Sequence, residues 1–117
     1  MQPEPGAAPS TDVAERALAD LVTELDRCVD ELMQARARAE NLLLERRSGR
    51  AWLEIVTNET RPLIVERIST VLASLSAAGS LWRREQAAAL QAEKVSINRI
   101  AALFGVTRQR ISALLKE

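Results

Sequence analysis

The stretch Ser96–Glu117, SINRIAALFGVTRQRISALLKE, contains two short apolar periodicities separated by one glycine. Ser96 and Thr107 are both residue types that commonly cap the start of a helix. Gly105 can adopt the left-handed backbone conformation that reverses a chain after a helix. Apolar side chains recur at helical spacing around the glycine: Ile100, Ala101, Phe104, Val106, Ile111, Leu114 and Leu115. The stretch therefore predicts two helices joined by a tight turn.

The spacing of the small and apolar residues is that of a bacterial helix-turn-helix. Ala101 is small enough for two helices to approach closely, Gly105 follows four residues later, and Ile111 follows six residues after that. The segment resembles the DNA-binding helix-turn-helix of bacterial transcriptional regulators, and GVTRQRIS also resembles sigma-factor region 4. The resemblance is confined to the C-terminal residues, and residues 12–79 resemble no family that we recognise.

Helical periodicity identifies the side chains of the second helix that point away from its core. With Ile111 directed inward at about 3.6 residues per turn, Gln109, Ala113 and Lys116 point outward. The resemblance implies that this helix enters a major groove with its N-terminal half facing base edges. Arginine can form two hydrogen bonds to guanine, and glutamine can do so to adenine. We therefore assign base contacts to Thr107, Arg108, Gln109, Ser112 and Ala113, with Gly105 in the turn.

Charge is distributed unevenly along the chain. Residues 80–117 contain seven basic and three acidic residues (net +4), whereas residues 1–79 contain nine and thirteen (net −4). No acidic residue occurs between Asn98 and Lys116. This asymmetry favours a nucleic-acid surface at the C-terminal end. We assign phosphate contacts to Arg83, Arg84, Arg99, Arg110 and Lys116; the alternative is that these are solvated charges on an ordinary helix pair.

Composition argues against catalysis. The 117 residues include no histidine and a single cysteine, Cys28, which excludes the common Cys/His metal sites and nucleophile–histidine pairs. We expect no enzyme activity, no metal and no cofactor. The lone cysteine fits a reducing compartment, no apolar run approaches the roughly 20 residues that span a bilayer, and no signal peptide is recognisable. These features predict a cytoplasmic protein without a membrane partner, and DNA binding would place it at the nucleoid.

The N-terminal half predicts one long amphipathic helix. Residues 1–11 are rich in proline and small residues and predict a disordered lead-in. Asp12 can cap a helix over 12–48, with Glu15 in the capping-box position. Steps of four and three residues define a single apolar seam: Leu18, Leu21, Leu25, Cys28, Leu32, Ala35, Ala39 and Leu42. This spacing is typical of a coiled coil and predicts a dimer seam; the alternative is packing against the helix's own chain.

The remaining residues predict an all-α chain with a small bundle after the long helix. Gly49 suits the end of the long helix. Residues 50–79 are expected to form a helical connector that ends at Gly79, and residues 80–117 a helix-turn-helix domain whose first helix begins after Ser80. Trp52 and Trp82 are expected to anchor the core.

Taken together, the patterns predict a homodimeric, sequence-specific transcriptional regulator that binds double-stranded DNA. Two alternatives remain. One is an architectural, nucleoid-associated protein that bridges DNA with little sequence preference. The other is an adaptor whose N-terminal helix binds another regulatory protein, while its C-terminal unit tethers it to DNA or to RNA polymerase.

Overall fold

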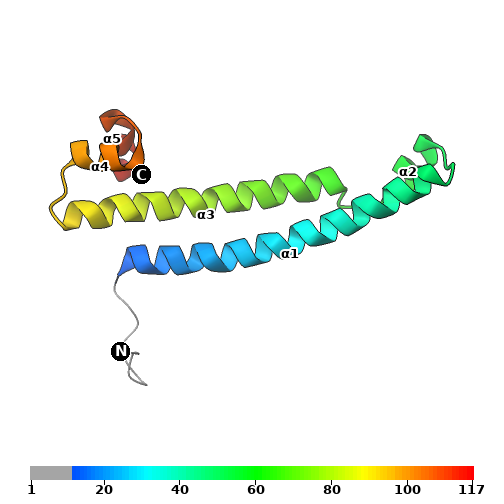
Figure 1. The fold of residues 1–117 in the computed structure, drawn as a ribbon, viewed down its shortest axis with the longest axis horizontal. Coiled ribbons are helices and arrows are strands. Elements are labelled where there is room, and N and C mark those ends of the chain that lie inside the picture. Colours follow the sequence, from blue (N-terminus) through cyan, green and yellow to red (C-terminus); the bar gives the residue numbers. More distant parts are fainter. Residues whose placement is uncertain (1–11) are drawn as a thin grey trace, which may run out of the picture. The chain divides into compact units, whose positions relative to one another are not determined.

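The structure, a computed structural model, describes residues 12–117; the predicted lead-in, residues 1–11, lies outside them. The described residues contain five helices and no strand (Figure 1): α1 (Val13–Arg47), α2 (Trp52–Asn58), α3 (Ile64–Ala92), α4 (Ile97–Phe104) and α5 (Arg108–Lys116). The predicted all-α class is therefore confirmed.

The chain divides into two units, each of which has its own internal contacts. The hairpin unit comprises residues 22–77, and the terminal unit comprises the described residues 12–21 together with residues 78–117. Helices α1 and α3 each contribute residues to both units.

The two ends of α1 follow the signals in the sequence. A carboxylate oxygen of Asp12 accepts a hydrogen bond from the backbone N–H of Glu15 at 3.0 Å, as expected for an N-cap. At the other end, Gly49 has a φ of 100° and its N–H donates to the carbonyl oxygen of Arg46 at 3.0 Å. The long helix predicted over residues 12–48 is thus present, and a glycine in the left-handed region ends it.

Within the hairpin unit, α1 and α3 run antiparallel and are joined by polar contacts. The guanidinium of Arg67 donates to Glu31 at 3.1 Å and to Gln34 at 3.0 Å. Seven residues further along α3, the hydroxyl of Ser74 donates to the carboxylate of Glu24. Higher residue numbers on α3 thus pair with lower numbers on α1, which is the antiparallel order visible in Figure 1.

The structure divides the predicted dimer seam into two groups. Cys28 and Ala35 are buried and Leu21 and Leu42 are half-buried, so their own chain covers them, as the alternative of packing within the chain predicted. The thiol of Cys28 lies 4.0 Å from the carbonyl oxygen of Val71, and burial raises the pKa of this thiol. The second group remains exposed: Leu18, Leu25, Leu32 and Ala39.

Helix α2 has one apolar contact face and one exposed face. Ile55 is buried, but Trp52 is 57% exposed. The guanidinium carbon of Arg46 lies 5.1 Å from the centroid of the Trp52 ring, a distance typical of a cation–π contact. The expectation that Trp52 anchors the core is therefore wrong, whereas Trp82 is half-buried.

Helix α3 passes through Gly79 without a break, so the expected helix end there and the new start after Ser80 are wrong. A glycine inside a helix costs only about 1 kcal/mol relative to alanine. The neighbouring Ala77 and Ala78 are strong helix formers, and a single weak position does not end a helix that continues on both sides. By length and composition alone α3 is also long and apolar enough to cross a membrane, which the sequence patterns did not predict.

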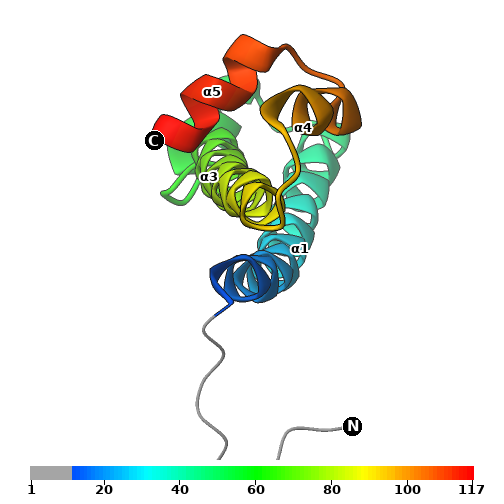
Figure 2. The same ribbon diagram turned by 90° about the vertical axis from the view of Figure 1, so that its left-hand side faces the viewer.

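The terminal unit is built around a small apolar core contributed by three helices. Figure 2 shows α4 and α5 beside the C-terminal part of α3. The buried residues at their junction are Ala87, Ile100, Ala101 and Ile111. Partly buried apolar side chains surround them: Leu90, Val95, Ile97, Phe104, Leu114 and Leu115. This core fixes which sides of α4 and α5 remain exposed.

Candidate nucleic-acid interface

The first helix of the motif, α4, begins at the predicted cap. The hydroxyl of Ser96 accepts a hydrogen bond from the backbone N–H of Arg99 at 3.2 Å. Ile100 is fully buried on the inner side of α4, and the adjacent Ala101 is 6% exposed. The small side chain of Ala101 lies in the core next to Ile111, as expected for a position where two helices meet closely.

The turn after α4 has the geometry predicted from its glycine. Gly105 has φ 68° and ψ 33°, in the left-handed region that residues with a Cβ adopt at a cost. Its N–H donates to the carbonyl oxygen of Ala102 at 3.3 Å, and the N–H of Val106 donates to that of Ala101 at 3.0 Å. This pair of bonds is a Schellman motif, which satisfies the last carbonyls of α4 and reverses the chain.

The second helix of the motif, α5, begins at Thr107. Its hydroxyl accepts a hydrogen bond from the backbone N–H of Arg110 at 3.1 Å, so Thr107 is the N-cap. Ile111, four residues later, is fully buried. The cap and this buried residue together fix which side of α5 faces outward.

The outward side of α5 brings together most of the residues predicted to contact bases. A shallow depression on this side is lined by Arg108, Gln109, Ser112, Ala113 and Lys116. All five are exposed except Ser112, which is half-buried. Thr107 does not line the depression but lies exposed at the adjacent end of the helix.

The predicted phosphate contacts fall into separate groups. Lys116 shares the depression with the predicted base readers, and Arg110 lines a second depression together with Arg83. The guanidinium carbon of Arg83 lies 4.2 Å from the centroid of the Phe104 ring, so the Arg83 side chain stacks on an aromatic residue of α4. Arg84 is ion-paired with Glu85 at 3.1 Å, and Arg99 is exposed on α4.

The basic side chains of α4 and α5 are not neutralised within the described chain. Among residues 12–117, no carboxylate lies within 4.0 Å of Arg99, Arg108, Arg110 or Lys116. The N-terminal end of α5 adds the partial positive charge of the helix dipole. The exposed side of α5 can therefore attract a polyanion and present hydrogen-bond donors to it.

Sequence reasoning missed one neighbour of this surface. Ser80, predicted to cap a new helix, instead lies inside α3 and lines the second depression with Arg83 and Arg110. Its spacing of three residues from Arg83 would have placed the two on one helix face had α3 been predicted to continue.

The chain matches no protein-family model, no curated protein sequence and no solved structure.

Proposed function

We propose that the protein is a sequence-specific DNA-binding transcriptional regulator that acts as a homodimer, with α5 in the major groove. The observation that carries this proposal is the outward side of α5. Its five polar, basic and small residues share one shallow surface opposite the fully buried Ile111, and none of its basic side chains is ion-paired within the described residues. A helix-turn-helix that presents such a face is suited to reading base edges.

The base readers in this proposal are Arg108 and Gln109, at the N-terminal end of α5. Both are exposed and both belong to the same depression. Arginine recognises guanine and glutamine recognises adenine through paired hydrogen bonds in the major groove. Ser112, Ala113 and Thr107 support them: a small side chain allows close approach, and a hydroxyl can bond to a base or a phosphate.

Phosphate contacts come from the basic residues that flank this face. Arg110 and Lys116 lie on α5 itself, and Arg99 is exposed on α4. Arg83 and Arg84 make contacts within the chain, to Phe104 and Glu85, and are the weaker candidates. Phosphate contacts set the position of a protein on DNA, whereas base contacts set its specificity.

We infer a homodimer because one helix-turn-helix contacts only a few base pairs. A single recognition helix contacts few bases, and helix-turn-helix proteins commonly bind two half-sites as two-fold dimers. The exposed apolar residues of α1 supply a surface for pairing. The proposed location is the bacterial cytoplasm, at the nucleoid.

The experiment that tests this proposal is binding of the purified full chain to genomic DNA fragments, sequenced after pull-down. The double variant Arg108→Ala, Gln109→Ala removes both base readers. Alanine favours helices, so the variant keeps α5. We expect a palindromic motif for the unmodified chain and loss of that motif for the variant, at about 1–3 kcal/mol per lost base contact.

The matched control removes one arginine and one glutamine elsewhere. Arg47 and Gln91 are both exposed and lie outside α4 and α5, so Arg47→Ala, Gln91→Ala should retain the motif. Enrichment without any motif, unchanged in the α5 variant, would support the architectural role instead. No enrichment at all would support an adaptor and would remove DNA from the proposal.

A further inference from the structure

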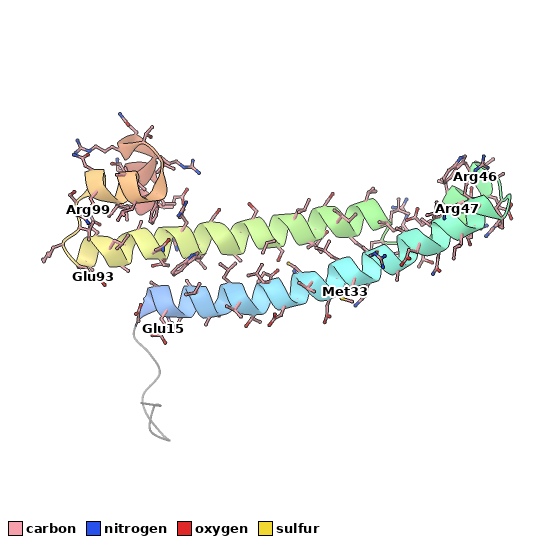
Figure 3. The ribbon with its side chains drawn as sticks, viewed as in Figure 1. Glu15, Met33, Arg46, Arg47, Glu93 and Arg99 are labelled. Carbon is pink, nitrogen blue, oxygen red and sulfur yellow. The ribbon has the colours of Figure 1, made fainter. Side chains whose placement is uncertain are left out.

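The hairpin unit carries a stripe of large apolar side chains that its own chain leaves exposed. On α1 the first four of these residues recur at steps of three and four, and the fifth lies eleven residues beyond the fourth. Their exposed fractions are between 42% and 55%: Val22, Leu25, Val29, Leu32 and Leu43. Met33, which is 65% exposed, widens the stripe and lies on the side of α1 away from α3 (Figure 3). Ala39 continues the same spacing, and Arg36 is the one charged residue within it.

Helix α3 extends the apolar surface on the same side of the hairpin. Val29 directly follows Cys28, and Leu72 directly follows Val71, the residue whose carbonyl lies against the Cys28 thiol. One residue further along a helix is a rotation of about 100°. When two antiparallel helices touch at one residue each, the next residue on each helix points to the same side of the pair. Val29 and Leu72 therefore lie on the same side of the hairpin. Leu72 is 59% exposed, and Val65, two turns earlier, is 67% exposed.

The hairpin covers only part of its apolar side chains. Cys28, Ala35 and Val71 are buried, and the Arg67–Glu31 ion pair joins α1 to α3. Other large apolar side chains, such as Leu32 and Leu72, remain exposed. Contiguous exposed apolar surface of this kind marks an interaction site. A seam at coiled-coil spacing fits another helix face.

The stripe on α1 is complementary to itself in one orientation. Its positions lie at nearly equal distances on either side of Leu32. An antiparallel copy centred there therefore places Leu25 opposite Ala39, and places Val22 and Val29 within one residue of Leu43 and Arg36. A parallel copy would instead place every residue opposite its own equivalent.

Charge distinguishes the two orientations. In a parallel pair, Arg36 would face Arg36 of the second copy inside an apolar seam, which is unfavourable. Arg36 is ion-paired with Glu40 of its own chain at 3.1 Å. In the antiparallel pair each Arg36 faces the region of Val29 in the second copy, and Asp30 is the next residue along. A second carboxylate can therefore approach each arginine, twice, as a two-fold contact requires.

We propose that this face of the hairpin unit, formed by the α1 stripe with Val65 and Leu72, binds the same face of a second copy. The two hairpins form an antiparallel four-helix arrangement with its two-fold axis at Leu32. This inference rests on the homodimer in the proposed function and assigns that homodimer its surface and its orientation.

The first test measures the mass of the full chain by sedimentation equilibrium without DNA. Leu32→Glu places two carboxylates opposite each other at the two-fold axis. We expect the unmodified chain to be a dimer and the variant to dissociate about a hundredfold more readily or further. Leu32 is 42% exposed, so the hairpin itself should fold, which circular dichroism checks. The matched control is Leu53→Glu, at an α2 position that is 79% exposed and outside the face; it should remain dimeric.

The second test reads the orientation. In a Cys28→Ala background, one chain carries Val22→Cys and another carries Leu43→Cys. An antiparallel pair forms disulfides only when the two chains are mixed, whereas a parallel pair forms them with either chain alone. Crosslinking of either chain alone would overturn the proposed orientation.

The outcomes separate this inference from the proposed function. A monomeric unmodified chain, a dimeric Leu32→Glu variant, or an exposed face that binds phospholipid vesicles without pairing would overturn the inference. A dimer that binds no DNA would overturn the proposed function and leave the inference intact. The Arg108→Ala, Gln109→Ala variant should remain a dimer in either case.

Discussion

The hydroxyl of Thr107 accepts a hydrogen bond from the backbone N–H of Arg110 at 3.1 Å, which closes the first turn of α5. Thr107 was also predicted to contact DNA, so its side chain has two candidate roles. The cap is a role that serine can fill equally well, because it needs only a hydroxyl on the β-carbon. The two roles can therefore be separated by substitution.

We predict that Thr107→Ala lowers the free energy of unfolding of the terminal unit by about 1 kcal/mol, because an N–H of α5 loses its acceptor. Thr107→Ser should stay within a few tenths of the unmodified value. Denaturant unfolding, followed by circular dichroism, measures both. If alanine and serine behave alike, the hydrogen bond does not stabilise α5. Weaker DNA binding by a fully stable Thr107→Ser chain would assign the threonine methyl group to the interface.

Two glycines should respond to alanine in opposite directions. Gly79 lies inside α3, and a Cβ built there meets nothing within 4 Å, so Gly79→Ala should raise stability by about 1 kcal/mol. Gly105 is equally free of contacts but has a φ of 68°, so Gly105→Ala should lower stability by about 1 kcal/mol. Because neither substitution creates a clash, the difference between the two stability changes reports the effect of backbone conformation alone. Thermal unfolding of the two variants in parallel measures it, and shifts of the same sign would contradict this argument.

Lys94 occupies a left-handed position without being glycine. Its φ is 71°, and the N–H of Val95 donates to the carbonyl of Leu90 at 3.1 Å, so Lys94 ends α3 as Gly105 ends α4. Lys94→Gly should therefore stabilise the chain by up to about 1 kcal/mol. Glu93→Gly, one residue earlier, has no positive φ to relieve and should destabilise it by a similar amount. Stabilisation by both variants would show that loop flexibility, rather than Lys94, dominates.

Stability should fall as the pH is lowered through the acid range. The hydrogen bond from Arg27, together with that from Ser74, lowers the pKa of Glu24 from 4.5 to about 2. Between these two values the unfolded chain binds a proton at Glu24 that the folded chain does not, so stability is present above pH 4.5 and is lost towards pH 2. Glu24→Gln should flatten this part of the profile. Glu93→Gln, an exposed carboxylate outside the hairpin unit, is the control; a profile unchanged in Glu24→Gln would assign the acid sensitivity elsewhere.

The terminal helices were predictable because their signals are local. Ser96 and Thr107 cap α4 and α5, Gly105 forms the turn, and Ile111 is buried, as the spacing predicted. Each of these features depends on a few neighbouring residues and the preferences of their backbone. The grouping of Arg108 and Gln109 on one face likewise follows from helix geometry alone.

The helical hairpin was not predictable to the same extent, because a periodic pattern identifies a face but not what covers it. Leu25 and Cys28 belong to one heptad series, yet only Cys28 is covered by its own chain. Gly79 misled because its local cost is small beside the stability of the helix that continues through it. Lys94 gave no signal, because its conformation is set by the hydrogen bonds that end α3 rather than by its own preference.

The salt dependence of DNA binding should reflect the number of phosphate contacts that α5 makes. Arg110 and Lys116 are exposed and have no ion-pair partner among residues 12–117, so each can displace counterions from DNA. We predict that Arg110→Gln and Lys116→Gln each reduce the slope of log affinity against log salt by about 1, on specific and random DNA alike. Fluorescence anisotropy at several salt concentrations measures this slope. Arg47→Gln removes an equal charge outside α4 and α5 and should leave it unchanged; a drop in affinity at constant slope would show that the substituted residue reads bases instead.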